Sequence, residues 1–454
     1  MIEQLIKKTK IVCTIGPASE KKEMLLKLVK AGMNVARLNF SHGTYEEHLK
    51  KIIAIREIEK ENNIIIPIML DTKGPEIRTH NFEGGLAKIT TGMVIRISMK
   101  EILGTATHFS VTFPGLYDDV AIGDRIKLDD GNLTLKVTDK DEKEHEIICV
   151  ALNHNDIRDK RGVNCPDTHL TLPFVSEQDR NDLIWGCKQH VNYVAASFIR
   201  SASDIREIRE ILDANGGENI QIISKVESTE AVKNLDEIIE NSDGLMVARG
   251  DLGIEVPQER IPGIQRVLIR KCILAKKPVI VATQMLHTMI NNPRPTRAEV
   301  TDIANAIYYR TDALMLSGET AYGKYPVEAV KTMTKVAAQA EKDKLEENDI
   351  RIPLDENSND VTAFLAKQAV KATSKLKIRA IITDSYSGRT ARNLAAFRGK
   401  YPVLAICYKE KTMRHLALSY GVEAIYMPEL ANGQQYYFAA LRRLLKEGRL
   451  QPSD

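Results

Sequence analysis

Short apolar runs, rich in Ile and Val, alternate with longer amphipathic stretches from residue 11 to about residue 340. Such runs, bounded by turn residues, are typical of strands that are buried on both faces of a parallel sheet. The pattern predicts eight strands, at Ile11–Ile15, Val35–Asn39, Ile64–Asp71, Tyr193–Phe198, Ile220–Lys225, Gly244–Ala248, Val279–Thr283 and Ala313–Ser317.

Helical periodicity fills most of the intervals between these strands. The predicted helices are Glu20–Lys30, Thr44–Lys60, Ser176–Gln189, Ser203–Leu212, Thr229–Ile239, Ile264–Ala275, Arg297–Tyr308 and Pro326–Ala340. This alternation predicts an α/β fold with a (β/α)8 TIM-type barrel as the catalytic domain, formed by residues 1–75 and 170–340.

Two other segments depart from the barrel pattern. Residues 76–169 show period-two alternation and turn signals such as Asp129-Asp-Gly-Asn, so we expect an inserted all-β lid domain that closes over the catalytic face. A charged stretch that begins at Glu341 reads as a linker or a domain-spanning helix. Residues 341–454 then return to helix–strand alternation, which predicts a C-terminal, doubly wound α/β domain that we expect to be shortened.

Polar side chains lie at the ends of six of the eight predicted strands. A single polar strand end indicates little, because the chain is leaving the core there. Six such ends in a barrel indicate a site, since functional residues gather at the carboxyl ends of the strands. The residues are Arg37, Asn39, Ser41, Asp71, Thr72, Lys73, Lys225, Glu227, Arg249, Gly250, Asp251, Thr283, Gln284, Ser317, Gly318 and Glu319.

Three of these residues suit a metal-assisted reaction. Glu227 and Asp251 follow neighbouring strands, so both carboxylates can reach one divalent cation. Proteins usually hold Mg²⁺ with one or two carboxylates, completed by water and phosphate oxygens. Lys225 beside that cation would stabilise charge on a transferring phosphoryl group or an enolate.

Bulk properties narrow the class of protein. Hydrophobic content of 43%, charged content of 28% and a net charge of +3 fit an ordinary soluble protein and give no support to nucleic-acid binding. Six cysteines without a CxxC pair fit the reducing cytoplasm. We find no apolar stretch long enough for a signal peptide or a membrane span.

Eight motifs, in order along nearly the whole chain, resemble those of the pyruvate kinase family. They are TKIVCTIGPAS from Thr9, MNVARLNFSHG from Met33, DTKGPEIR from Asp71, ISKVE from Ile223, VARGDLGIE from Val247, ATQML from Ala282, NPRPTRAE from Asn292 and MLSGETA from Met315. The resemblance implies phosphoryl transfer from phosphoenolpyruvate to ADP, giving pyruvate and ATP. It also implies a cytoplasmic homotetramer that uses Mg²⁺ (or Mn²⁺) and K⁺.

The resemblance also implies roles for individual residues. Lys225, Arg37 and Thr283 match catalytic positions, and Arg37, Gly250, Asp251 and Thr283 match contacts to phosphoenolpyruvate. Glu227 and Asp251 match the Mg²⁺ ligands, and Asn39, Ser41, Asp71 and Thr72 match the K⁺ ligands. Asn39, His42, Arg78 and Arg161 match nucleotide contacts. Glu76 is typical of family members that need K⁺, whereas members that dispense with K⁺ tend to carry Lys there.

The chain departs from the family pattern at several places. Arg161 replaces the usual lysine, Tyr309-Arg310 replaces an Asp-Gly pair, and His287 stands where an acid is common. The loop from Ser385 to Thr390 resembles an effector phosphate-binding loop, but the final strand pair that completes that site in the family is not in this sequence. We therefore hold effector binding only as a hypothesis.

Two other functions remain as alternatives. A metal-dependent lyase or aldolase on a similar barrel would handle the same enolate without ADP. A catalytically weak, regulatory relative would bind ligands with negligible turnover. The paired cation sites and the lid argue against the first, and the intact catalytic positions argue against the second.

Overall fold

The computed structural model describes residues 7–344, 360–429 and 433–454. Eight parallel strands close into a barrel in the order β1-β17-β16-β15-β14-β13-β3-β2, which confirms the predicted TIM-type barrel. The strands are β1 (Lys10–Thr14), β2 (Val35–Asn39), β3 (Ile68–Asp71), β13 (Tyr193–Ala196), β14 (Gln221–Val226), β15 (Gly244–Ala248), β16 (Val279–Ala282) and β17 (Ala313–Leu316).

Two of these strands are shorter than predicted by two or more residues. β3 begins at Ile68 rather than Ile64, because Pro67 has no N–H to donate to a strand ladder. β13 ends at Ala196 rather than Phe198, and Phe198 has a φ of 55°, which takes the backbone out of the extended region.

Helices surround the barrel as predicted, but one predicted helix is divided and two short helices, α8 (Arg249–Glu255) and α11 (Gly318–Ala321), were not predicted. The predicted helix Thr229–Ile239 divides into α6 and α7 around Asn234, and α8 was not predicted because a seven-residue helix with two glycines has too little periodicity. The helices are α1 (Lys22–Ala31), α2 (Tyr45–Asn62), α4 (Glu177–Lys188), α5 (Ala202–Asp213), α6 (Thr229–Lys233), α7 (Leu235–Asn241), α8 (Arg249–Glu255), α9 (Ile261–Leu274), α10 (Arg297–Tyr308), α11 (Gly318–Ala321) and α12 (Pro326–Asp343).

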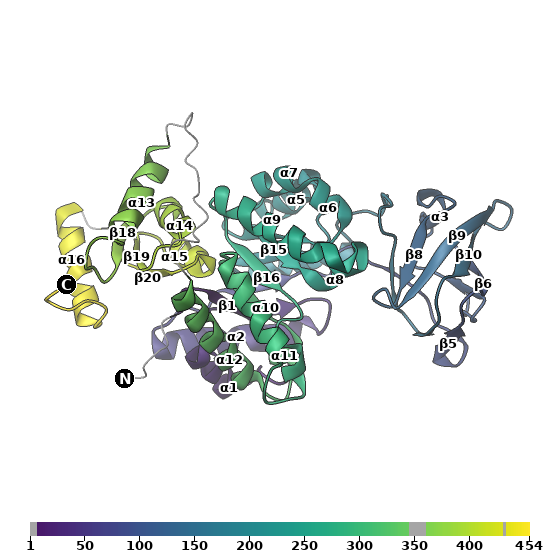
Figure 1. Cartoon of the computed structure of the whole chain (residues 1–454), viewed down its shortest axis with the longest axis horizontal. Helices are drawn as coiled ribbons and strands as arrows, with labels where there is room; N and C mark the ends of the chain where they lie inside the picture. Colours follow the sequence, from purple (N-terminus) through teal and green to yellow (C-terminus); the bar gives the residue numbers. More distant parts are fainter. Residues whose placement is uncertain (1–6, 345–359, 430–432) are drawn as a thin grey trace.

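The lid is inserted between β3 and β13. It contains a seven-stranded mixed sheet in the order β4-β12-β8-β9-β10-β6-β7, a two-stranded sheet of β5 and β11, and its own hydrophobic core. Its elements are β4 (Ile77–Arg78), β5 (Leu86–Ile89), β6 (Val94–Ser98), β7 (His108–Ser110), α3 (Leu116–Asp119), β8 (Arg125–Leu128), β9 (Leu133–Asp141), β10 (Glu146–Ala151), β11 (Asn155–Arg158) and β12 (Gly162–Asn164). The lid lies at one end of the molecule, against the carboxyl ends of the barrel strands (Figure 1).

A C-terminal parallel α/β domain lies at the opposite end (Figure 1). Three parallel strands, β18 (Ile381–Ser385), β19 (Val403–Cys407) and β20 (Val422–Tyr426), are flanked by α13 (Val361–Ala372), α14 (Arg389–Ala396), α15 (Glu410–His415) and α16 (Gly433–Lys446). Helix α16 was not predicted as a helix, and most of the predicted charged linker lies outside the described residues.

The C-terminal domain closes the amino-terminal end of the barrel. Leu418 is fully buried and packs among the side chains that fill the barrel interior. Nearby, the Tyr193 hydroxyl donates to the carbonyl of Arg414 at 2.8 Å, and Lys10 Nζ donates to the carbonyl of Val422 at 2.7 Å. The far end of the barrel is therefore plugged by protein, which leaves the carboxyl ends of the strands as the open face.

Candidate active site

A buried chain of alternating charges joins three strand ends. Arg37 on β2 donates from Nε to Asp71 Oδ2 on β3 at 2.6 Å, and Lys225 Nζ on β14 lies 3.2 Å from Asp71 Oδ1. Burial alone would raise the pKa of Asp71, but the charges of Arg37 and Lys225 outweigh it and hold that pKa below its usual value. Three residues that were predicted separately therefore form one ionised cluster.

Glu227 extends this chain of charges. Its Oε1 lies 2.9 Å from Lys225 Nζ, and its Oε2 accepts a hydrogen bond of 2.6 Å from the backbone N–H of Phe198. Burial raises the pKa of Glu227 to about 8, with the Asp251 charge adding to the increase and Lys225 opposing it. A fully buried carboxylate of this kind needs a further positive charge to remain ionised near neutral pH.

Asp251 reaches the site from a helix. The predicted strand Gly244–Ala248 matches β15, and Arg249, Gly250 and Asp251, which were expected at its end, form the first turn of α8. The Gly250 N–H donates to Thr283 Oγ1 at 2.8 Å, and Arg249 Nη2 donates to the Thr283 carbonyl at 2.7 Å. Through these two hydrogen bonds, Thr283 fixes the start of the helix that carries Asp251. Thr283 itself has a φ of 67°.

The donor set fits a divalent cation bound by two carboxylates. Glu227 is 0% exposed with an elevated pKa, and Asp251 is close enough to contribute to that elevation. In the described part of the chain, no cluster of three or more His, Cys, Asp or Glu side chains is arranged to hold a metal. A cation here would complete its shell with substrate and water oxygens, as Mg²⁺ usually does.

The predicted K⁺ ligands lie at the adjoining ends of β2 and β3, where Asn39 pairs in register with Asp71. Asn39 Oδ1 accepts from the Ser41 N–H at 3.2 Å, and Thr72 Oγ1 accepts from the Ser197 N–H at 3.1 Å. All four predicted ligands present oxygen atoms, which suits a hard cation. Both carboxylate oxygens of Asp71 are also engaged by Arg37 and Lys225.

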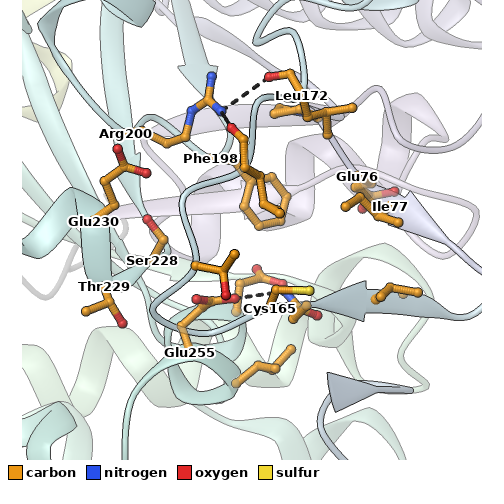
Figure 2. Close-up of a pocket in the computed structure, with 18 of the residues that line it drawn as sticks. Glu76, Ile77, Cys165, Leu172, Phe198, Arg200, Ser228, Thr229, Glu230 and Glu255 are labelled. Atoms are coloured by element: carbon orange, nitrogen blue, oxygen red, sulfur yellow. Dashed lines mark hydrogen bonds between the residues drawn. The ribbon is translucent and has the colours of Figure 1, made fainter. Parts of the chain in front are cut away.

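A cleft of about 580 Å³ opens between the lid and the barrel. Figure 2 shows Ser228, Thr229 and Glu230 on one side of it and Glu76 and Ile77 on the other. Its lining also includes the predicted nucleotide contacts Arg78 and Arg161, together with Asp251.

The predicted nucleotide contacts do not all meet at this cleft. Arg78 forms an ion pair of 2.8 Å with Glu76, and Arg161 lies 3.4 Å from Asp129 Oδ1. Glu76 thus forms an ion pair with one of the predicted nucleotide contacts. His42 is exposed in the loop after β2 and is not part of the cleft lining.

Sequence reasoning missed two hydroxyl groups. Ser197 Oγ, just after β13, accepts a hydrogen bond from Lys225 Nζ at 2.7 Å and lies 3.3 Å from Asp71 Oδ1. Thr14 Oγ1, at the end of β1, accepts from Arg37 Nη1 at 2.8 Å. They belong to the two strands whose polar ends were left out of the prediction, and the available signal was their place at the carboxyl end of a buried strand, the last residue of β1 for Thr14 and the first after β13 for Ser197.

Comparison with known proteins agrees with this geometry. Residues 6–330 match the family model described as "Pyruvate kinase, barrel domain", and residues 364–454 match "Pyruvate kinase, alpha/beta domain". The chain is 48% identical to the pyruvate kinase of Geobacillus stearothermophilus, over 99% of this chain and 76% of that protein. It is 45% identical to that of Bacillus licheniformis, over 99% of this chain and 77% of that protein.

A solved structure gives the same result. The crystal structure of a pyruvate kinase from Cryptosporidium parvum superposes with a TM-score of 0.93 at 37% identity, covering 99% of this chain and 92% of that one. Within the described residues, we find no helix with the length and apolar character needed to cross a bilayer. The family models, the relatives that match 99% of this chain and the shared fold all agree, and the chain belongs to the pyruvate kinase family.

Proposed function

We propose that this chain transfers the phosphoryl group of phosphoenolpyruvate to ADP at the carboxyl ends of the barrel strands, giving pyruvate and ATP. The observation that carries the proposal is the position of Lys225 Nζ, which is buried between the carboxylates of Asp71 and Glu227. Burial lowers the pKa of Lys225, but these two carboxylates outweigh it and raise that pKa, so the lysine is a fixed positive charge. Phosphoryl transfer depends mainly on such positioning and charge stabilisation.

Two cationic side chains would act on the transferring group. The bond from phosphorus to the enolate oxygen breaks as a bond to a β-phosphate oxygen of ADP forms. Arg37 offers a planar guanidinium for two oxygen contacts, whereas Lys225 acts as a compact point charge. Both are oriented by Asp71, so neither has to reorganise as charge develops.

Glu227 and Asp251 would hold Mg²⁺ or Mn²⁺. A bound divalent cation supplies a Lewis acid that withdraws charge from phosphoryl and enolate oxygens. Asn39, Ser41, Asp71 and Thr72 would hold K⁺ beside the same phosphate, which adds positive charge near Arg37.

Thr283 and Gly250 would orient the three-carbon part of the substrate. Thr283 Oγ1 donates to the Ala282 carbonyl at 2.6 Å and accepts from the Gly250 N–H. The hydroxyl is therefore held in one orientation, facing the start of α8. From there it would help to deliver the proton that converts the enolate to pyruvate.

Arg78, Arg161, His42 and Asn39 would contact the nucleotide. Arg78 and Arg161 come from the lid, so its closure would bring positive charge onto the phosphates of ADP. We also propose a cytoplasmic homotetramer, by likeness to the family. Effector binding at the loop from Ser385 to Thr390 stays a hypothesis, supported only by the turn in which Ser385 Oγ accepts from the Gly388 N–H at 3.0 Å.

The test is pyruvate formation from phosphoenolpyruvate with Mg²⁺, measured with and without ADP and in KCl or NaCl at equal ionic strength. We expect turnover that requires ADP and rises strongly with K⁺. Equal rates in the two salts would contradict the proposed K⁺ site but not the proposed phosphoryl transfer. Product formed without ADP would indicate a lyase. Ligand binding without product in either salt would indicate a disabled relative.

A further inference from the structure

Two lid residues hold the end of α8 that lies farthest from Asp251. Lys127 on β8 donates from Nζ to the backbone carbonyl of Ile254, and Asn164 Nδ2 on β12 donates to Glu255 Oε1 at 3.2 Å. Lys127 and Asn164 are cross-strand partners in the lid sheet. One face of the lid therefore presents two donors side by side to two consecutive residues of the barrel.

These contacts satisfy groups that a helix end leaves open. The last four carbonyls of a helix have no partner within it, and the end carries partial negative charge. Lys127 supplies both a donor and a positive charge to one of these carbonyls. Burial raises the pKa of Glu255 to about 7, with Asn164 and Lys127 opposing the increase, so the carboxylate depends on lid residues for its stabilisation.

The other end of α8 is held by the barrel. The Gly250 N–H bonds to Thr283, and Leu252 is fully buried in the barrel core. The helix has only seven residues, about two turns, so its two ends move together. Asp251 and Glu255 are four residues apart and share one face, which places the lid contact directly in line with the proposed metal ligand.

We propose that Lys127 and Asn164 form a latch through which the lid positions α8, and with it the Asp251 carboxylate. This inference rests on the proposed function of Asp251 as a ligand for the divalent cation. Lys127 and Asn164 are positioning residues that contact neither the cation nor the reacting atoms. Closing the lid would therefore do more than exclude water, because it would also fix one of the two metal ligands.

The test compares the wild type with Lys127→Met, Asn164→Ala and the double variant. Lys136→Met is the matched control, because Lys136 is an exposed lid residue on β9. The first measurement is hydrogen exchange of the α8 amides in the ligand-free protein. We expect exchange to be about 3- to 10-fold faster in the latch variants and unchanged in Lys136→Met.

The second measurement is Mn²⁺ binding, followed by electron paramagnetic resonance without substrate. Loss of both latch residues should weaken Mn²⁺ binding by about 10-fold, the size of effect typical of residues that orient metal ligands. Glu255→Gln, which keeps an acceptor for Asn164, should bind Mn²⁺ more tightly than Glu255→Ala. Exchange and Mn²⁺ affinity equal to those of Lys136→Met would overturn the latch. Neither readout needs turnover, so a failure of the proposed reaction would be seen separately.

Discussion

Lys225 Nζ donates a 2.7 Å hydrogen bond to Ser197 Oγ, and Ser197 in turn donates its hydroxyl proton to the Thr72 carbonyl at 2.6 Å. The serine is 2% exposed and lies just beyond the neighbouring strand β13. Its own donor is committed to the backbone, so its lone pairs face the lysine. Ser197 therefore helps to fix the orientation of the long Lys225 side chain. Charge stabilisation requires such preorganised groups.

Replacement of Lys225 by Met should sharply slow phosphoryl transfer. The variant keeps most of the length of the side chain but loses the charge, so we expect kcat to fall roughly 10²–10⁴-fold. Mn²⁺ binding should survive, because Glu227 and Asp251 are retained. The measurement is steady-state pyruvate formation, with Lys136→Met as the control for loss of a lysine. Near wild-type turnover would show that Lys225 has no part in the mechanism.

Gly74 links the start of the lid to the catalytic strand ends. Its φ is 76°, and a Cβ there would lie 2.8 Å from Ser197 Cβ and 2.9 Å from Phe198 Cδ2. Gly74→Ala should therefore cost about 2–3 kcal/mol of stability, from backbone strain together with crowding. It should also lower kcat, because Ser197 and Phe198 orient Lys225 and Glu227. Chemical denaturation and steady-state kinetics measure the two effects.

Gly84→Ala is the matched control for Gly74. Gly84 has a φ of 65°, but nothing lies within 4 Å of its Cβ position. The substitution should cost about 1 kcal/mol from the backbone alone and leave kcat unchanged. Equal losses of stability and of kcat in the two variants would show that the close approach of residue 74 to Ser197 has no consequence.

The architecture was predictable because each barrel strand is a continuous apolar run, and such runs leave a clear pattern. The site was predictable to the extent that its residues lie within or just after those runs, as Arg37, Asp71 and Glu227 do. Helix α8 was missed because its stabilising contacts are distant in sequence: Thr283 holds its start and the lid holds its end. Ser197 was missed because a serine after a strand is an ordinary observation until Lys225 is seen beside it.

Leu418 tests how far the barrel depends on the C-terminal domain. This side chain is 0% exposed and packs against the interior of the barrel, although it belongs to the other domain. Leu418→Ala should destabilise the protein by about 2–4 kcal/mol, because the cavity lies between two rigid surfaces. Leu376→Ala is the control, since Leu376 is 60% exposed in the same domain. Thermal unfolding of both variants would measure the difference in stability. Equal melting temperatures would show that Leu418 does not stabilise the contact between the C-terminal domain and the barrel.

Asp182 carries a buried charge that the protein does not fully satisfy. The residue is 2% exposed, its Oδ1 accepts from the Tyr45 hydroxyl at 2.7 Å, and its Oδ2 has no hydrogen-bond partner among the described residues. Burial raises the pKa of Asp182 from 3.8 to about 6, with the Asp179 charge adding to the increase and Tyr45 opposing it. The folded protein therefore binds this proton more tightly than the unfolded chain does.

The sign of the pH dependence follows from that difference. Between about pH 4 and pH 6 the unfolded chain releases the proton first, so the contribution of Asp182 to stability falls as the pH rises and is constant above that window. Asp182→Asn keeps the acceptor for Tyr45 but cannot ionise, so it should be more stable than the wild type by about 1–2 kcal/mol at pH 7 and no more stable near pH 4. Denaturant unfolding at a series of pH values measures this, with Asp156→Asn as the control because Asp156 is exposed. A constant difference between Asp182→Asn and the wild type across the series would show that the buried charge is not its cause.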